Sequence, residues 1–508
     1  MIVNEDEEAK RKKEKTSKII ITVSVIIIFV LVAFFIAFIV IKGNAELAKR
    51  KTLENNTKET SNVTVENNEE EQISNEKIVN NPNEELNKSF GKVEIVWLDA
   101  QNNITEEPAK PVLSGMTPVK YNQFNLSFEK TTSDDADWYN YSNRIWANAV
   151  DTNSSYFVWI PRYAYKIVYY SDSSYSKIIG YSDARGILKV TDDKNTLTRI
   201  QAKNTGLREV GNHYILAPAF MKDTASGFNN GGWDINISGF WCAKYEMSME
   251  VNEVHMETDD TTSGNVTVSN IVKAVSKPAV SSWRNISIGL AYNNAFNYNR
   301  TLESHMMKNS EWGAVAYLAY SVYGRDAYAL EVNDSRDYLT GDSTVETDVY
   351  NTKIKQSTTG NATGIYDLAG GASEFVSSFI NNGYSRLQEF GGTGEDYLLE
   401  TASSNKYKTV YSNASSDDGK SRYSQTFALQ NFDANRLRRG DAIYETSING
   451  FGSTSWNINS SFYVQQDIPF FVRGGAYTGE TSAGLFNYNG ASGQADASDS
   501  FRVVLVTE

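Results

Sequence analysis

The stretch PFFVRGGAYTGETSAGLFNYNGASGQADASDSFRVVLV, residues 469–506, contains two apolar segments separated by a polar, glycine-rich one. FFVRGGAY and SFRVVLV are rich in β-branched and aromatic residues, which favour strands. The residues between them are mainly Tyr, Asn, Ser, Gly and Asp, which are common in turns and in binding loops. We therefore predict two core strands near the end of the chain, joined by exposed loops.

Similar apolar runs, bounded by turn-forming residues, occur throughout the chain from residue 93 onward. Only two stretches have the apolar spacing of a helix, Ser287 to Asn299 and a second one from about Asn309 to Gly324. Strands, then two amphipathic helices, then loops and strands indicate an α+β fold with two main helices, many short strands and long loops. The main strand candidates are VEIVWL (93–98), YFVWIPRYAYKIVYY (156–170), HYILAPAF (213–220) and GFWCAKYEM (239–247).

Composition excludes several classes of protein. The 508 residues include 48 Lys and Arg against 62 Asp and Glu, a net charge of −14, which disfavours nucleic acid as a partner. The single cysteine, Cys242, cannot form an internal disulfide or a multi-thiolate metal site. The three histidines have no zinc-site spacing, so we expect them to be surface or hydrogen-bonded groups. Four tryptophans lie in apolar periodic segments and are expected in the core: Trp159, Trp241, Trp283 and Trp312.

The N-terminal segments predict a membrane anchor. Ile19–Ile41 is an uncharged apolar run of 23 residues, long enough to span a bilayer. The basic residues of the tail, 1–18, favour a cytoplasmic N-terminus, which makes this a single-pass cell-membrane protein with its C-terminal domain extracellular. Residues 43–92 are polar and predict a stalk, with a coiled coil as the alternative. A cleaved signal peptide and a pilin-type helix are the alternatives for 19–41.

Several motifs in order resemble the formylglycine-generating-enzyme/sulfatase-modifying-factor superfamily, whose fold is a variant of the C-type lectin fold. The resemblance covers about residues 156–506, and implies one C-type-lectin-like domain over that range. Residues 93–155 would then form a small β-rich extension. The motifs are FVWIP (157–161), GFW through KYEMS (239–248), PAVSSW (278–283), SEW (310–312), GIYDLAG (364–370) with Glu374, and RGGAY (473–477) with GLF (484–486) and SFRVV (500–504).

Two further resemblances concern lineage. The runs at 157–167, 305–318 and 364–371 are similar to those of non-catalytic, membrane-tethered surface proteins of Gram-positive bacteria. The final stretch resembles the variable region of diversity-generating-retroelement target proteins, which display ligand contacts on the same fold. The first resemblance bears on lineage and topology and implies no activity, whereas the second implies a binding function.

The resemblance to an oxidase does not extend to its chemistry. Enzymes of the superfamily hold copper with two cysteines in the C-terminal part, and no cysteine lies between Arg473 and Arg502. Cys242 lies in the GFWC run, where alternation predicts a small buried apolar residue. No nucleophile motif accompanies a histidine. We therefore expect a protein that is not an enzyme and has no redox cofactor.

Calcium is the one cofactor that the resemblance implies. Asp367 and Glu374 match positions near which family members hold Ca²⁺, and carboxylate oxygens suit that ion. Gly371 stands where the family has an asparagine ligand. The alternative is that Glu374 is a buried carboxylate paired with Arg473 or Arg502, and that Gly371 permits a positive φ.

The expected function is extracellular recognition of an unknown protein or glycan, with a structural cell-envelope role or an enzyme of uncharacterised chemistry as alternatives. Aromatic and polar residues between the last two apolar segments supply the candidate binding face. Packing of Phe486 into the core is an open alternative, and a site in the long insert between Leu387 and Pro469 is another. The candidate residues are Tyr477, Thr478, Glu480, Phe486, Tyr488, Asn489, Ser492 and Gln494.

Overall fold

The chain divides into two compact units, Met1–Val79 and Asn80–Glu508, and all the elements described below belong to the second. The structure is a computed structural model. The residues that it describes are 91–169, 209–210, 214–222, 231–251, 254–256, 272–326, 328–342, 349–392, 397–399, 405–413, 425–435, 438–447 and 449–507.

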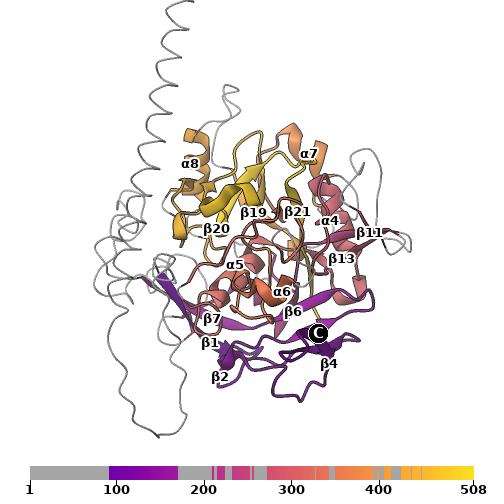
Figure 1. Cartoon of the computed structure of the whole chain (residues 1–508). Helices are drawn as coiled ribbons and strands as arrows, with labels where there is room; N and C mark the ends of the chain where they lie inside the picture. The colour runs from indigo at the N-terminus through magenta and orange to yellow at the C-terminus, as the bar shows by residue number, and fades with distance from the viewer. Residues whose placement is uncertain are drawn as a thin grey trace, which may run out of the picture. The chain divides into compact units, whose positions relative to one another are not determined.

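Two sheets contain the N-terminal strands of this unit (Figure 1). The C-terminal strand β22 (Val503–Leu505) lies between β14 and β10, so the end of the chain returns to a sheet built mostly from early strands. The first sheet has the order β2 (Ile104–Thr105), β1 (Gly91–Leu98), β7 (Tyr163–Tyr169), β9 (Tyr214–Leu216), β8 (Glu209–Val210). The second has the order β14 (His305–Met306), β22, β10 (Gly239–Ala243), β6 (Tyr156–Pro161), β5 (Asn148–Val150), β3 (Thr117–Asn122), β4 (Ser127–Lys130).

Two more sheets complete the unit. The two apolar segments of residues 469–506 do not pair with each other. FFVRG forms β19 (Phe470–Gly474), whereas SFRVVLV divides into β21 (Asp499–Phe501) and β22, which belong to different sheets. A small sheet has the order β12 (Val254–Met256), β11 (Ser248–Val251), β13 (Val272–Val275). The larger one has the order β16 (Thr409–Ser412), β15 (Ser373–Asn381), β19 (Phe470–Gly474), β20 (Gly484–Ala491), β18 (Ser461–Phe462), β17 (Phe451–Gly452), and β21 (Asp499–Phe501) also pairs with β15.

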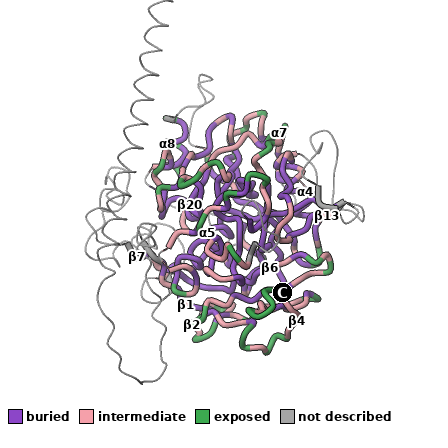
Figure 2. The backbone as a smooth tube through the Cα atoms, viewed as in Figure 1, coloured by how far each residue is buried: buried purple, intermediate pink, exposed green. Residues whose placement is uncertain are grey.

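Both helices expected from the sequence are present. Helix α4 is Ile288–Phe296, and the Ser287 hydroxyl caps it by accepting a hydrogen bond from the backbone N–H of Leu290. Helix α5 is Asn309–Ala319, and all of its residues are buried, so it is a central helix rather than the amphipathic surface helix that its pattern predicts (Figure 2). Three more helices are α6 (Val349–Thr352), α7 (Ser385–Gly391) and α8 (Gln425–Ala434).

The predicted fold class and localisation are wrong on these observations. The described part is a mixed α/β structure with five α-helices rather than two. Helices α6 and α7 have only 4 and 7 residues, too few to show a helical period, whereas α8 buries Ala428 and Phe432, four residues apart, a pattern that the prediction missed. The longest described helix, α5, has 11 residues, about 16 Å or half of a bilayer core. Within the described residues no helix is long and apolar enough to cross a membrane, so a single-pass anchor with an extracellular C-terminal domain is not supported. The segment Ile19–Ile41, the tail 1–18 and nearly all of the stalk 43–92 lie outside the described residues.

Strands on both sides of residue 155 share sheets. β1 pairs with β7 along seven residue pairs, and β5 pairs with β6. The β-rich extension 93–155 and the domain 156–506 therefore form one unit in the structure, Asn80–Glu508.

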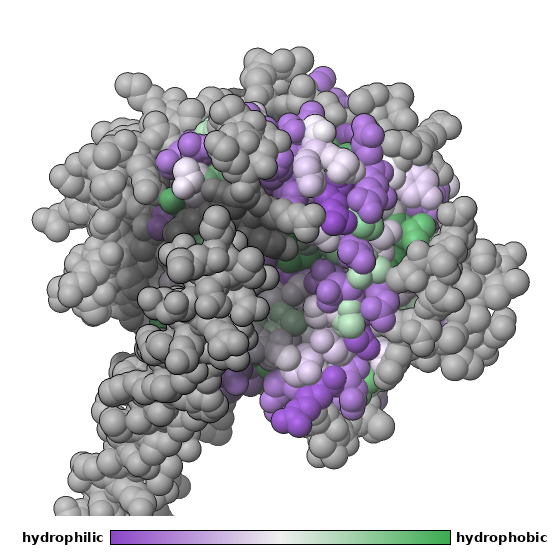
Figure 3. Space-filling view, turned by 90° about the horizontal axis from the view of Figure 1, so that it is seen from above, coloured by the Kyte–Doolittle hydropathy of each residue, from purple (hydrophilic) through white to green (hydrophobic). Residues whose placement is uncertain are grey.

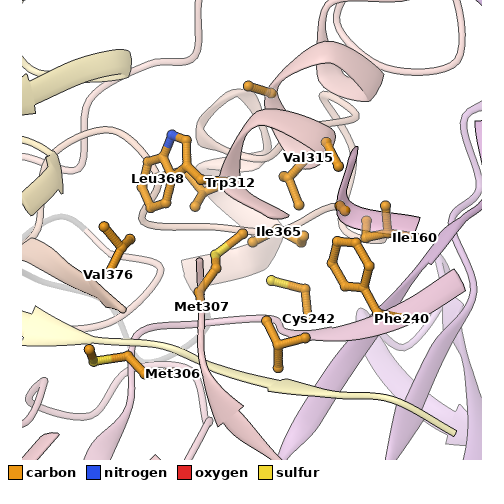
Figure 4. Packing of buried hydrophobic residues seen from close by; sticks show 14 of the residues in the cluster. Ile160, Phe240, Cys242, Met306, Met307, Trp312, Val315, Ile365, Leu368 and Val376 are labelled. Carbon is orange, nitrogen blue, oxygen red and sulfur yellow. The ribbon is translucent and has the colours of Figure 1, made fainter. Parts of the chain in front are cut away.

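The core encloses the residues that the apolar patterns predict. The four tryptophans are fully buried, as expected. Cys242 is also fully buried, packed near Met307 and Phe240 (Figure 4), which confirms its prediction as a small apolar residue. Burial raises the pKa of the Cys242 thiol, which keeps it protonated and unreactive.

Candidate functional site

A cleft of about 720 Å³ opens beside the start of β20. Besides β20, its walls come from five places: the end of α5, the loop that follows α5, the 3-10 helix η6 (Ile354–Gln356) with Lys353 before it, the segment before β18 and the short 3-10 helix η9 (Tyr477–Ser482). Its polar and aromatic lining residues are Tyr320, Glu331, Asp334, Lys353, Gln356, Asn457, Asn459, Tyr477, Glu480 and Thr481, and its apolar ones include Ala329, Leu330, Val332, Ile458 and Leu485.

Asn459 joins two walls of the cleft. Its amide nitrogen donates to the carbonyl of Ala483 at 3.0 Å, and its oxygen accepts from the backbone N–H of Phe486 at 3.2 Å. Gly484 makes this approach possible, since a Cβ there would lie 2.3 Å from the Asn459 side-chain oxygen. The cleft wall is therefore held by specific hydrogen bonds rather than by loose loop packing.

Three non-glycine residues on the cleft wall have left-handed backbone angles. Asn457 has φ 60°, Ile458 has φ 64° and Glu480 has φ 46°. This region costs an L-residue about 1–2 kcal/mol and is unusual for a β-branched residue such as Ile458. Such outliers tend to occur at functional sites, where the surrounding structure enforces them.

Tyr477 is anchored at the rim of the cleft. Its backbone N–H donates to the carbonyl of Gly371 at 2.8 Å, and its ring meets Tyr338 edge-on at 4.9 Å between centroids. The guanidinium of Arg284 lies over the ring of Tyr338, 3.9 Å from its centroid. The half-buried Tyr477 ring is thus fixed in place while part of it remains accessible.

The eight predicted ligand-binding residues do not form one face. Tyr477 and Glu480 line the cleft, with the exposed Thr478 beside them. Ser492 and Gln494 follow the far end of β20, whose eight residues span about 25 Å. The half-buried Asn489 lies near that end and donates to Asn487 at 3.0 Å.

Phe486 and Tyr488 are core residues, with no exposed surface. Phe486 packs against Tyr320 and Trp456, with centroids 4.7 and 5.1 Å away, which is the alternative that the sequence left open. Tyr488 lies in the middle of a sheet, since β20 is flanked by β19 and β18.

The sequence missed the cleft residues outside the final stretch. Asn457, Ile458 and Asn459 belong to the insert between Leu387 and Pro469, which was the alternative location. Glu331 and Asp334 lie in a loop, and Lys353 and Gln356 lie at the two ends of the 3-10 helix η6; neither segment carries a recognisable motif. The only signal for them would have been a run of polar residues, which is common in any loop.

A buried acidic cluster lies behind Tyr477. Glu246, Asp367 and Glu374 are each about 1% exposed, with Arg502 as their buried cationic neighbour. Arg502 binds Glu374 through two hydrogen bonds of 2.9 and 2.6 Å. Its Nη1 donates to the carbonyl of Ala243 at 2.7 Å, and Nη2, which also binds Glu374, donates to the carbonyl of Tyr366 at 2.9 Å.

This cluster bears on the calcium prediction. Both oxygens of Glu374 are occupied by Arg502, so Glu374 does not fit a calcium ligand in this arrangement. Asp367 accepts hydrogen bonds from Asn333 (2.9 Å) and the backbone of Gly341 (2.7 Å) through one oxygen. Gly371 has φ 70°, so the structure has the features of the ion-pair alternative, with Arg502 as the partner. Among the described residues, no group of three or more His, Cys, Asp or Glu side chains could hold a metal.

We expect Glu246→Gln to flatten the pH dependence of stability. Burial, and then the charge of Asp367, raise the pKa of Glu246 well above its usual range. A carboxyl whose pKa is raised on folding stabilises the protein most below its unfolded pKa, and this contribution is lost as pH rises through the folded pKa. Gln keeps the acceptor for the backbone N–H of Ala372 (2.9 Å) without a titrating group.

Urea unfolding at pH 5 and pH 8 measures this effect. The stability lost between the two should be smaller in Glu246→Gln than in the native chain, while exposed Glu106→Gln serves as the control. An equal or larger loss in Glu246→Gln would show that this carboxyl is not the titrating group.

Comparisons with known proteins do not identify a family. No protein-family model matches the chain, and no curated protein is significantly similar to it in sequence. The resemblance to the formylglycine-generating-enzyme superfamily stays a prediction.

Proposed function

We propose that this chain is a non-catalytic recognition protein that binds its ligand in the cleft beside β20. The observation that carries the proposal is the cleft itself, about 720 Å³ in volume and lined by Tyr477, Glu480 and Asn457. Ligand sites of small molecules and side chains usually enclose about 300–1,000 Å³. Apolar walls with a few fixed polar groups are also typical of such sites.

The strained backbone of the cleft wall supports a functional role for the cleft. Asn457, Ile458 and Glu480 have left-handed φ angles, and Ile458 is 57% exposed, so its side chain gains little from burial. Twelve other non-glycine residues of the described chain also have positive φ, so the strain supports the proposal only together with the cleft.

A non-catalytic role is also consistent with the sequence. The superfamily that the motifs resemble uses a cysteine pair in its C-terminal part, and the chain has only Cys242, which is buried. The resemblance to that superfamily is itself part of this proposal, and so is binding of a protein or glycan.

The test is a screen of the full-length chain on glycan and peptide arrays. For a ligand found there, Tyr477→Ala should weaken binding by about 2 kcal/mol, as for an aromatic interface anchor. Phe124→Ala is the matched control, because Phe124 is a fully exposed aromatic residue outside the cleft. Unchanged affinity in Tyr477→Ala would place the binding site elsewhere.

A further inference from the structure

We infer that the ligand of the cleft carries ammonium groups on an apolar methylene chain, as linear polyamines and lysine side chains do. This inference rests on the proposed function, since it names the chemistry of the ligand at the same site. Three features of the lining carry it: its charge, an unpaired buried acceptor, and the apolar residues between the charges.

The cleft has an excess of negative charge. Glu331, Asp334 and Glu480 are exposed carboxylates on its lining, and Lys353 is the one lysine or arginine among the described lining residues. Asp334 and Glu480 form no ion pair with any described residue, and the nearest cation to Glu331 is Lys355 at 3.9 Å. With Lys353 and the more distant Lys355 set against the three carboxylates, about one to two negative charges remain, which favours a cationic ligand.

Gln356 adds an independent requirement for a hydrogen-bond donor. It lines the cleft and is only 2% exposed. Its amide nitrogen donates weakly to the carbonyl of Val332 at 3.3 Å, whereas its Oε1 oxygen accepts no hydrogen bond from the described residues. A buried acceptor without a partner costs free energy, so a ligand donor that reached it would be stabilised.

The apolar lining suits the rest of such a ligand. Leu330, Val332 and Leu485 occur among the carboxylates and can cover methylene groups. The Tyr477 ring at the rim offers a face that attracts a cation. Arg284 already lies over Tyr338, the ring that contacts Tyr477.

A neutral or anionic ligand fits less well. An anion would meet three carboxylates, and a neutral polyol would leave their charge uncompensated. On the coloured part of the face in Figure 3, hydrophilic side chains predominate and the hydrophobic ones lie in small separate areas.

Calorimetric titration of the full-length chain with 1,4-diaminobutane, spermidine and a trilysine peptide tests the inference. We expect binding of these amines, no binding of the neutral analogue 1,4-butanediol, and weaker binding at higher salt, since salt screens exposed charges. Stronger binding of spermidine would indicate a free polyamine, and stronger binding of trilysine a peptide.

Charge-neutral variants connect binding to the cleft. The double variant Asp334→Asn/Glu480→Gln should bind amines about tenfold more weakly or worse, because it lacks two of the charged acceptors of the cleft. Asp134→Asn with Glu106→Gln is the matched control, because these carboxylates are exposed and outside the cleft, and it should leave binding unchanged.

Two results would overturn the inference: no binding of any amine, or equal loss of binding in the cleft and control variants. If an array ligand without an amine is lost in Tyr477→Ala and kept in Asp334→Asn/Glu480→Gln, the cleft is the site and only its ligand chemistry is wrong. If Tyr477→Ala affects neither amines nor array ligands, the proposed function fails as well.

Discussion

Replacing Arg502 by methionine should lower the free energy of unfolding by about 3–5 kcal/mol, the usual cost of breaking a buried ion pair by removing one partner. The Arg502 guanidinium is fully buried and binds both oxygens of Glu374. It also donates to the carbonyls of Ala243 and Tyr366, which come from distant parts of the chain. Without it, three buried carboxylates would share no cation, and three hydrogen-bonded segments would lose their common donor.

Urea unfolding of the purified variant measures the loss, and a double variant tests its cause. In Arg502→Met/Glu374→Met the carboxylate is removed together with its partner, so the double variant should be more stable than Arg502→Met alone. If the free energy of unfolding that the double variant loses equals the sum of the losses in the two single variants, the cause is packing or the backbone carbonyls and not an unpaired carboxylate.

Tyr488→Ala should also destabilise the fold strongly, by about 3–5 kcal/mol, the cost of removing a large aromatic side chain from a core. Tyr488 has no exposed surface and pairs with Arg473 on one side and Ser461 on the other. Its ring contacts Tyr463 edge-on at 6.5 Å. The sequence predicted instead that Tyr488 is exposed and that its loss affects binding with little change in stability.

Tyr477→Ala is the contrasting variant. The Tyr477 ring is half-buried at the cleft rim, so its removal should cost far less stability than Tyr488→Ala, and thermal unfolding of the two variants compares them directly. Equal melting temperatures for the two would mean that Tyr488 is not packed as the structure shows.

Much of the secondary structure follows from local patterns. Ser287 before α4, and the apolar spacing of α5, fix those helices because capping and periodicity are local properties. Runs such as GFWCA and FFVRG form β10 and β19 because β-branched and aromatic residues favour strands. Helices α6 and α7 were not predicted because 4 and 7 residues are too few to show a helical period, and the apolar spacing of Ala428 and Phe432 in α8 was missed. The membrane and localisation predictions rested on residues outside the described part.

The candidate site was predicted only in part, because a sequence does not show what covers a strand. Tyr488 and Tyr477 both have glycines close by in the sequence, yet one lies in a central strand and the other on a rim. The register shifts between Arg473 and Gly474, and this irregularity helps to separate β19 from the loop that carries Tyr477.

The sequence by itself determined the strands and the two main helices, the burial of Cys242 and of the tryptophans, and the lack of a C-terminal cysteine pair. These properties depend on residue type and on spacing within one segment. Only the tertiary structure decided that Arg502 is the partner of Glu374, and that Tyr477 shares a cleft with Asn457 and Asp334. Arg502 and Glu374, like Tyr477 and Asp334, are more than a hundred positions apart, and their geometry arises only when separate elements pack together.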